Sequence, residues 1–158
     1  MTGVVRPAEP RDLDRVAALW TAITQHHAGF DPLFTQRRDA DDALRDLIRE
    51  LHRDRDAAIF VFDRAGDLPG MCIVRIDRAP PILEETERAE ITDVGVREDA
   101  RRQGIARRLV EAALAWVRAA NVERVEVQVA VNNPEGQAFW RALGFGDLLH
   151  ILHRRLEL

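Results

Sequence analysis

The sequence predicts one mixed α/β domain, and three features of the chain support this prediction. The 158 residues suit a single domain, 1–158, which is long enough to bury a stable core. A hairpin pattern over 57–77 indicates antiparallel strands in the first half. A long amphipathic helix followed by a Val-rich segment then indicates a βαβ unit, whose two strands must be parallel.

The first third of the chain predicts a strand and two helices. VVRPA at 4–8 is a short strand, and apolar residues at helical spacing predict a helix over 10–24. HHAGFDPLF at 26–34 is predicted as a loop, and a second amphipathic helix is predicted over 39–54. That helix has acidic residues in its first turn, where they complement the helix dipole.

The middle of the chain predicts three strands. AAIFVFD at 57–63 and LPGMCIVRID at 68–77 are joined by the turn signal DRAGD, so they form a hairpin. APPILEET at 79–86 is a connection interrupted by proline, and AEITDVGV at 89–96 is the next strand.

The last third begins with the long helix, which follows Gly104 and ends near Asn121, a residue suited to a C-terminal cap. A Val-rich strand over 124–131 follows it. A short helix is predicted over 132–143, and one or two closing strands are predicted over 144–158.

Composition excludes several classes of function. A net charge of −4 argues against nucleic acid as a partner. The single cysteine, Cys72, cannot form an intramolecular disulfide, and no cluster of Cys and His suggests a metal site. No apolar run approaches the length of a membrane span, so we expect a cytoplasmic protein without membrane contact.

The stretch RRQGIA, Arg101 to Ala106, combines positive charge with small residues at the start of the long helix. The first turn of a helix leaves backbone N–H groups without partners, and the helix dipole adds a positive end. These groups can bind phosphate where the backbone is accessible, as Gly104 and Ala106 would allow. The stretch lacks the ending of a P-loop and the glycines of a dinucleotide fingerprint.

In this context the chain resembles the GNAT superfamily of N-acetyltransferases, which use acetyl-coenzyme A. The family's pyrophosphate loop, Arg/Gln-x-x-Gly-x-Gly/Ala, is matched by Arg101 to Ala106. About thirty residues later, NPEGQAFWRALGF resembles the family's Asn-x-x-small-x-x-Phe-Tyr-x-x-x-Gly-Phe pattern. The resemblance implies a mostly antiparallel central sheet with one parallel, splayed strand pair and about four flanking helices.

The resemblance also implies how acetyl-CoA would bind. Its pyrophosphate would lie on amides from about 102 to 107, and its pantetheine arm would pair with backbone groups of Val94 and Val96, with Gly95 as a bulge that helps the strands part. The Val94 amide would polarise the thioester carbonyl, and Asn133 matches the Asn that contacts the cofactor arm. The expected cofactor-binding residues are Val94, Gly95, Val96, Arg101, Arg102, Gln103, Gly104, Ile105, Ala106, Arg107, Asn133 and Trp140.

Transfer of an acetyl group to an amine requires the neutral amine, so a general base is expected. Alternation along the strand places Glu90, Thr92 and Val94 on one face and Asp93 on the other. Glu90 matches a position that carries the base in several members of the family, so it is our first choice and Asp93 the second.

Two further features bear on the chemistry. Many family members protonate the leaving thiolate with the Tyr of the Phe-Tyr pair, but this chain has no Tyr and carries Trp140 there, which we expect to pack. The region containing His26, His27 and Phe30 shapes the acceptor pocket in the family, and a solvated loop is the simpler interpretation.

The resemblance therefore predicts an acetyl-CoA-dependent N-acetyltransferase. The alternative is a CoA-binding sensor or partner domain with reduced or lost catalysis, an alternative that the missing Tyr keeps open. A small amine and a peptide N-terminus both remain open as acceptors, and so does a homodimer.

Overall fold

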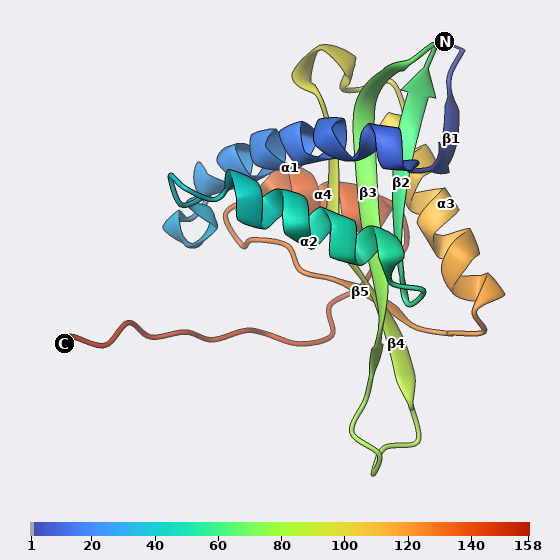
Figure 1. Ribbon diagram of the computed structural model, residues 1–158. Helices are drawn as coiled ribbons and strands as arrows, with labels where there is room; N and C mark the ends of the chain where they lie inside the picture. The colour runs from blue at the N-terminus through green and yellow to red at the C-terminus, as the bar shows by residue number, and fades with distance from the viewer. Residues whose placement is uncertain (1) are drawn as a thin grey trace.

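A computed structural model describes residues 2–158. Five strands form one sheet in the order β1-β2-β3-β4-β5, antiparallel except for the β4–β5 pair (Figure 1). The strands are β1 (Val4–Pro7), β2 (Ala57–Arg64), β3 (Asp67–Arg78), β4 (Glu87–Val96) and β5 (Val125–Val127). The helices are α1 (Leu13–Ala28), α2 (Asp41–Arg53), α3 (Ile105–Ala119) and α4 (Pro134–Ala142), with 3-10 turns η1 (Pro10–Asp12), η2 (Pro32–Phe34) and η3 (Glu98–Ala100). The predicted fold class is confirmed, and so is the predicted order of elements up to α4.

The helices cover the two faces of the sheet and divide the core into two halves (Figure 1). Alternate residues of β2 and β3 point to opposite faces, since side chains of a strand alternate. Phe60, Phe62 and Cys72 pack with α3 and α4, while Val61 and Ile73 pack with α1 and α2. Each helix has one apolar stripe turned toward the sheet.

A buried carboxylate, Asp12, fixes the start of α1 against β1. Its side chain is fully buried and accepts hydrogen bonds from Arg6 Nη1 at 2.6 Å, Arg15 Nη2 at 2.9 Å and the Glu9 amide at 2.9 Å. Arg6 also donates to Asp63 on β2 at 2.9 Å. The network joins β1, β2 and the start of α1, and the buried carboxylate is paired with the guanidinium groups of Arg6 and Arg15.

Three segments differ from the prediction by more than two or three residues. Helix α1 continues through His26 and His27 to Ala28, because neither histidine interrupts a helix and the first glycine is Gly29. Strand β5 forms only over 125–127, the part that pairs with β4, and 128–131 is not strand. The closing strands predicted over 144–158 do not form, and residues 146–158 run as an extended coil away from the body (Figure 1).

Smaller features of the prediction can also be compared with the structure. The C-cap of α3 is Ala120, one residue before the expected Asn121, and Asn121 follows it in the left-handed conformation with φ +60°. The helical spacing of Leu44, Leu47, Ile48 and Leu51 predicts one buried stripe on α2, but Leu47 is 42% exposed. None of the helices in the described residues is both long and apolar enough to cross a membrane.

Candidate active site

Strand β4 contains a bulge that changes which side chains share a face. Ile73 of β3 pairs with Asp93, and the adjacent Val74 pairs with Ile91, so Thr92 is an extra residue on β4. Cross-strand partners lie on the same face, and Arg75 pairs with Glu90. Since Arg75 and Ile73 point the same way, their partners Glu90 and Asp93 both face α1 and α2.

This finding corrects the expectation from strand alternation. Glu90 does not share a face with Val94, because the bulge at Thr92 reverses the alternation between them. Val94 instead packs with Ile91 and Cys72 toward α3. The two candidate bases, Glu90 and Asp93, are thereby brought onto one face.

The surroundings of Asp93 raise the pKa of its carboxyl group. The pKa of Asp93 is raised to about 6, chiefly by burial and to a smaller extent by the charge of Glu90, while hydrogen bonds from Thr92 and Trp20 partly oppose the rise. Glu90 accepts a hydrogen bond from Arg75 Nη2 at 3.2 Å, and its side chain is 12% exposed. Asp93 would therefore change its protonation state near neutral pH, while Glu90 is held in an ion pair.

The edge of β4 is open beyond the bulge. The β4–β5 ladder covers only 89–91 on β4, so the strands part before Val94. The Arg97 amide donates to the Pro69 carbonyl at 2.7 Å, so alternate residues Val94 and Val96 direct their backbone groups away from β3, toward the side of β5. The Val96 carbonyl accepts a hydrogen bond from Arg101 Nε at 3.1 Å. An extended ligand could pair with this edge as an added strand.

Gly95 is not the bulge that the resemblance implied, because it pairs regularly with Met71, and it has instead a role in packing. It faces α1, and a Cβ atom at this position would lie 2.1 Å from Cδ1 of Ile23. The absence of a side chain therefore lets α1 approach β4 closely, which keeps Trp20 next to Asp93.

The loop before α3 presents a run of unpaired amides. Within residues 2–158 the backbone N–H groups of 102–107 have no hydrogen-bond acceptor, and the first helical bond runs from the Arg108 amide to the Gly104 carbonyl. Arg102 has φ +61° and Gly104 has φ +74°, which turn the chain sharply into the helix. No side chain caps this helix, and Arg101, Arg102 and Arg107 are exposed beside the amides. The loop thus has both the donors and the charge that a phosphate requires.

The two residues of the second motif have clear structural positions. Asn133 caps α4, its side-chain oxygen accepting a hydrogen bond from the Gly136 amide at 2.9 Å. Trp140 is 9% exposed and packs edge-on against Phe139 and Phe145, with ring centroids 5.0 and 5.1 Å apart. The indole belongs to the core on the α3 side of the sheet.

An aromatic cluster closes the end of α1. His26 packs on Phe30 at 5.1 Å between ring centroids, and His27 packs on Phe34 at 5.6 Å. Burial, together with the charge of His26, lowers the pKa of His27 below its ordinary value. The predicted loop at His26 and His27 is therefore wrong, because both residues lie on the last turn of α1.

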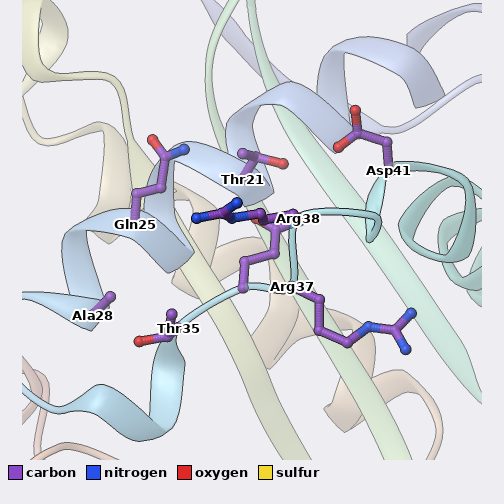
Figure 2. A pocket seen from close by; sticks show the side chains of 8 residues that line it. Thr21, Gln25, Ala28, Thr35, Arg37, Arg38 and Asp41 are labelled. Carbon is purple, nitrogen blue, oxygen red and sulfur yellow. The ribbon is translucent and has the colours of Figure 1, made fainter.

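A hollow of about 380 Å³ lies elsewhere, between α1 and the chain leading into α2 (Figure 2). It is lined by Thr21, Gln25, Ala28, Thr35, Gln36, Arg37, Arg38 and Asp41. It includes no residue of β4 or of the loop before α3, so the hollow is separate from the candidate site.

Comparisons with known proteins agree with this arrangement. The BH1408 protein from Bacillus halodurans, solved as a tetramutant, has 21% sequence identity and a TM-score of 0.85, and the alignment covers 97% of this chain and 99% of that one. AAC(6')-Iy, solved with the bisubstrate analog CoA-S-monomethyl-acetylneamine, has 17% identity and a TM-score of 0.80 over 100% of both chains. AAC(6')-IG from Acinetobacter haemolyticus, an aminoglycoside 6'-N-acetyltransferase, has 16% identity and a TM-score of 0.77 over 98% of this chain and 99% of that one.

At these identities, the three structures establish the shared fold. No curated protein matches the sequence. The sequence profile of the acetyltransferase (GNAT) family matches residues 20–145, which include β2 to β5, the loop before α3 and both motifs. The chain therefore belongs to the GNAT acetyltransferase family.

Proposed function

We propose that this protein transfers the acetyl group of acetyl-CoA to a primary amine by direct attack of the amine on the thioester. The observation that carries the proposal is the presence of two features at one end of the sheet. Six consecutive amides at 102–107 have no acceptor among the described residues, and no strand of residues 2–158 pairs with the outer edge of β4 at Val94 and Val96. The first suits a pyrophosphate, and the second suits an extended amide chain.

The residues present fit acetyl-CoA as a substrate. Arg101, Arg102, Gln103, Gly104, Ile105, Ala106 and Arg107 would hold the pyrophosphate, and Val94, Gly95, Val96, Asn133 and Trp140 would border the pantetheine arm. The side-chain NH₂ of Asn133 makes no hydrogen bond to another described residue, so it can serve the ligand while its oxygen caps α4. The thioester supplies an acetyl group on a good leaving group, because a free thiol has a pKa of about 8.5.

The Val94 amide is the donor suited to the developing oxyanion. It points to the open side of β4 and lies directly after Asp93. A backbone donor of this kind is fixed before the reaction begins, and such a donor lowers the barrier by about 2.7–4 kcal/mol.

Asp93 is the group best suited to take the proton from the amine. An alkylammonium with a pKa of about 10.4 is roughly 4.6 kcal/mol from its neutral form at pH 7, so a base that accepts the proton reduces this cost. With its pKa raised to about 6, Asp93 is largely ionised at pH 7 but more basic than an ordinary carboxylate. Glu90 raises that pKa and would attract the cationic acceptor, so the two acids have different roles.

The acceptor amine would approach from the α1 side, where Asp93 and Glu90 face. His26 and His27 lie on the same helix as Trp20, about two turns further along, and Phe30 packs on His26 just after the helix ends, so these three residues would form the far wall. AAC(6')-Iy is an aminoglycoside N-acetyltransferase, so an aminoglycoside is one acceptor to test for this chain, with peptide N-termini as the comparison.

Gly104→Val tests the loop. The position has φ +74° with open space around a Cβ atom, so the valine would strain the turn and cover the amides that a phosphate needs. Affinity for coenzyme A should fall at least about tenfold, or ~1.4 kcal/mol, by calorimetry.

Gly66→Val is the matched control, because Gly66 has φ +90°, equally open space, and a place in the β2–β3 turn. It should reproduce the backbone strain and leave the affinity for coenzyme A unchanged. Equal affinity in wild type and folded Gly104→Val would remove the basis for the proposed function.

Trp140→Phe tests whether the residue at the family's Tyr position takes part in the chemistry. The indole packs between two phenyl rings, and a phenyl group preserves most of that contact. Turnover, measured as thiol release with an accepted amine, should stay within about tenfold of wild type. A hundredfold loss of kcat with unchanged binding would show that the indole N–H contributes to the transition state.

A further inference from the structure

Strand β5 is attached to β4 by little backbone pairing. It is three residues long, and its ladder with β4 covers only 89–91. On one face of the sheet Val125 and Val127 pack toward α3. On the other face β5 presents Glu126, which lies directly opposite Glu90 of β4. Like charges in this position destabilise a sheet, so each of the two carboxylates needs a cation of its own.

Four charged side chains strengthen this attachment, and we name them together the β5 clamp: Arg88, Glu126, Arg124 and Glu85. Arg88 Nε donates to Glu126 Oε1 at 2.7 Å, and Arg124 Nη1 donates to Glu126 Oε2 at 2.6 Å. Arg124 also forms a bidentate pair with Glu85 of the β3–β4 connection, donating from Nε at 2.7 Å and from Nη2 at 2.6 Å. The clamp therefore alternates in charge and joins β4, β5 and the connection.

The geometry of the clamp is that of ion pairs that contribute to stability. An isolated surface pair contributes little, but a bidentate arginine–carboxylate contact within a network is an exception. The side chains of Glu126 and Arg124 are 26% and 35% exposed, so water screens their charges only in part. Burial raises the pKa of Glu126, but hydrogen bonds from Arg124 and Arg88 outweigh burial and lower the pKa overall. Glu126 is therefore held as a carboxylate by its two arginines.

The clamp lies at the end where β4 and β5 are still paired. The two strands part before Val94, and the pantetheine arm of acetyl-CoA would pair with β4 there. On the basis of the proposed function, in which acetyl-CoA occupies this place, we propose that the β5 clamp fixes β5 at its paired end and so sets how far the two strands stand apart at Val94. Its four members are positioning residues, which act on acetyl-CoA through β5.

Hydrogen exchange of the Ala89 amide tests the clamp on the full chain without a ligand. This amide donates to the Arg124 carbonyl at 2.9 Å, so its exchange rate reports on the contact between β4 and β5. Arg124→Gln removes both ion pairs of the arginine and should raise this rate about tenfold, while amides in the centre of β2 and β3 should keep theirs. Arg124→Lys retains the charge without the bidentate contact, so its rate should lie between those of wild type and Arg124→Gln.

Arg49→Gln is the matched control for hydrogen exchange and for binding. It breaks a pair with Asp46 on α2, where the two side chains are 2.9 Å apart, and should leave the Ala89 rate unchanged. In calorimetry Arg124→Gln should weaken the binding of coenzyme A about tenfold, and Arg49→Gln should not. In turnover assays Arg124→Gln should raise KM for acetyl-CoA and leave KM for the amine unchanged.

The exchange and binding results distinguish failure of the clamp from failure of the proposed function. An unchanged Ala89 rate in Arg124→Gln would overturn the clamp. A raised rate with wild-type affinity for coenzyme A would overturn its positioning role. Wild type that does not bind coenzyme A would overturn the proposed function together with the positioning role, and the Ala89 rate would then decide the clamp alone.

Discussion

Asp93→Asn is expected to lower kcat by ~10²–10⁴ at neutral pH, the usual size of a general-base effect. The amide keeps the shape of the side chain and cannot accept the proton of the amine. The wild-type rate should rise with pH through an inflection near 6, the pKa to which burial raises this carboxyl. The inflection should be absent in the variant, and the rate difference should shrink as the pH approaches the pKa of the amine itself. A pH–rate profile on one amine measures both.

Glu90→Gln is the matched control for Asp93→Asn, since it also replaces a carboxylate on the same face by its amide. Glu90 is already paired with Arg75, so its removal should cost less and should act mainly on KM. If Glu90→Gln loses more kcat than Asp93→Asn, the base is Glu90, as the sequence alone suggested.

The stability of Asp93→Asn separates a catalytic role from a structural one. Folding raises the pKa of this carboxyl above its ordinary value of 3.8, so ionisation costs stability as the pH rises from about 4 through 6. The variant has no charge to bury, so at pH 7 it should unfold at a temperature no lower than wild type. A large loss of both stability and activity would show that Asp93 supports the fold instead.

Asp12→Ala should lower the free energy of unfolding by about 3 kcal/mol at pH 7, because it leaves partners of a buried carboxylate without their acceptor. Arg6, Arg15 and the Glu9 amide all donate to this fully buried side chain. Urea denaturation measures the loss, and Asp12→Asn, which retains one acceptor oxygen, should lose less.

The pH dependence of stability tests whether the charge of Asp12 causes this loss. The hydrogen bond from Arg6, which acts more strongly than burial, lowers the pKa of Asp12. The stability that the Asp12 carboxylate contributes is therefore fully present above its ordinary pKa of 3.8. This stability is lost as the pH falls through the lower pKa that the group has in the folded protein. Wild type and Asp12→Ala should converge in stability in acid, and a difference that stays constant from pH 7 into acid would contradict this account.

The sequence predicted the loop before α3 well because its signals are local. Six adjacent residues contain a glycine, a small residue two positions later and flanking arginines. In the structure that glycine has φ +74°. The element order was equally accessible, since turns and amphipathic stripes are read within one segment. The roles of these residues in binding acetyl-CoA remain predictions until the Gly104 variant is measured.

Features that depend on distant partners could not be predicted in this way. The bulge at Thr92 shows only in the register with β3, and the burial of Asp93 depends on α1. The helical spacing of Trp20 predicts a core residue, and nothing near it in the sequence reveals its hydrogen bond to Asp93. The end of α1 was misplaced because His26 and His27 have no strong helix preference, and the closing strands lack any partner within the chain.

The extra residue in β4, Thr92, also determines how the strand would respond to a deletion. The side chains of β4 alternate regularly before and after Thr92, but the alternation shifts by one position at that residue. Ile91 and Val94 therefore both reach the α3 core, although they are three positions apart. Deleting Thr92 would leave Asp93 opposite Ile73 and Val94 opposite Cys72, because it removes only the residue that has no partner on β3. Pairing of the same residues without the bulge would instead turn either Glu90 or Asp93 into that apolar core, since the two are three positions apart. The two carboxylates therefore share one face of the sheet only because β4 holds one residue more than the strand beside it.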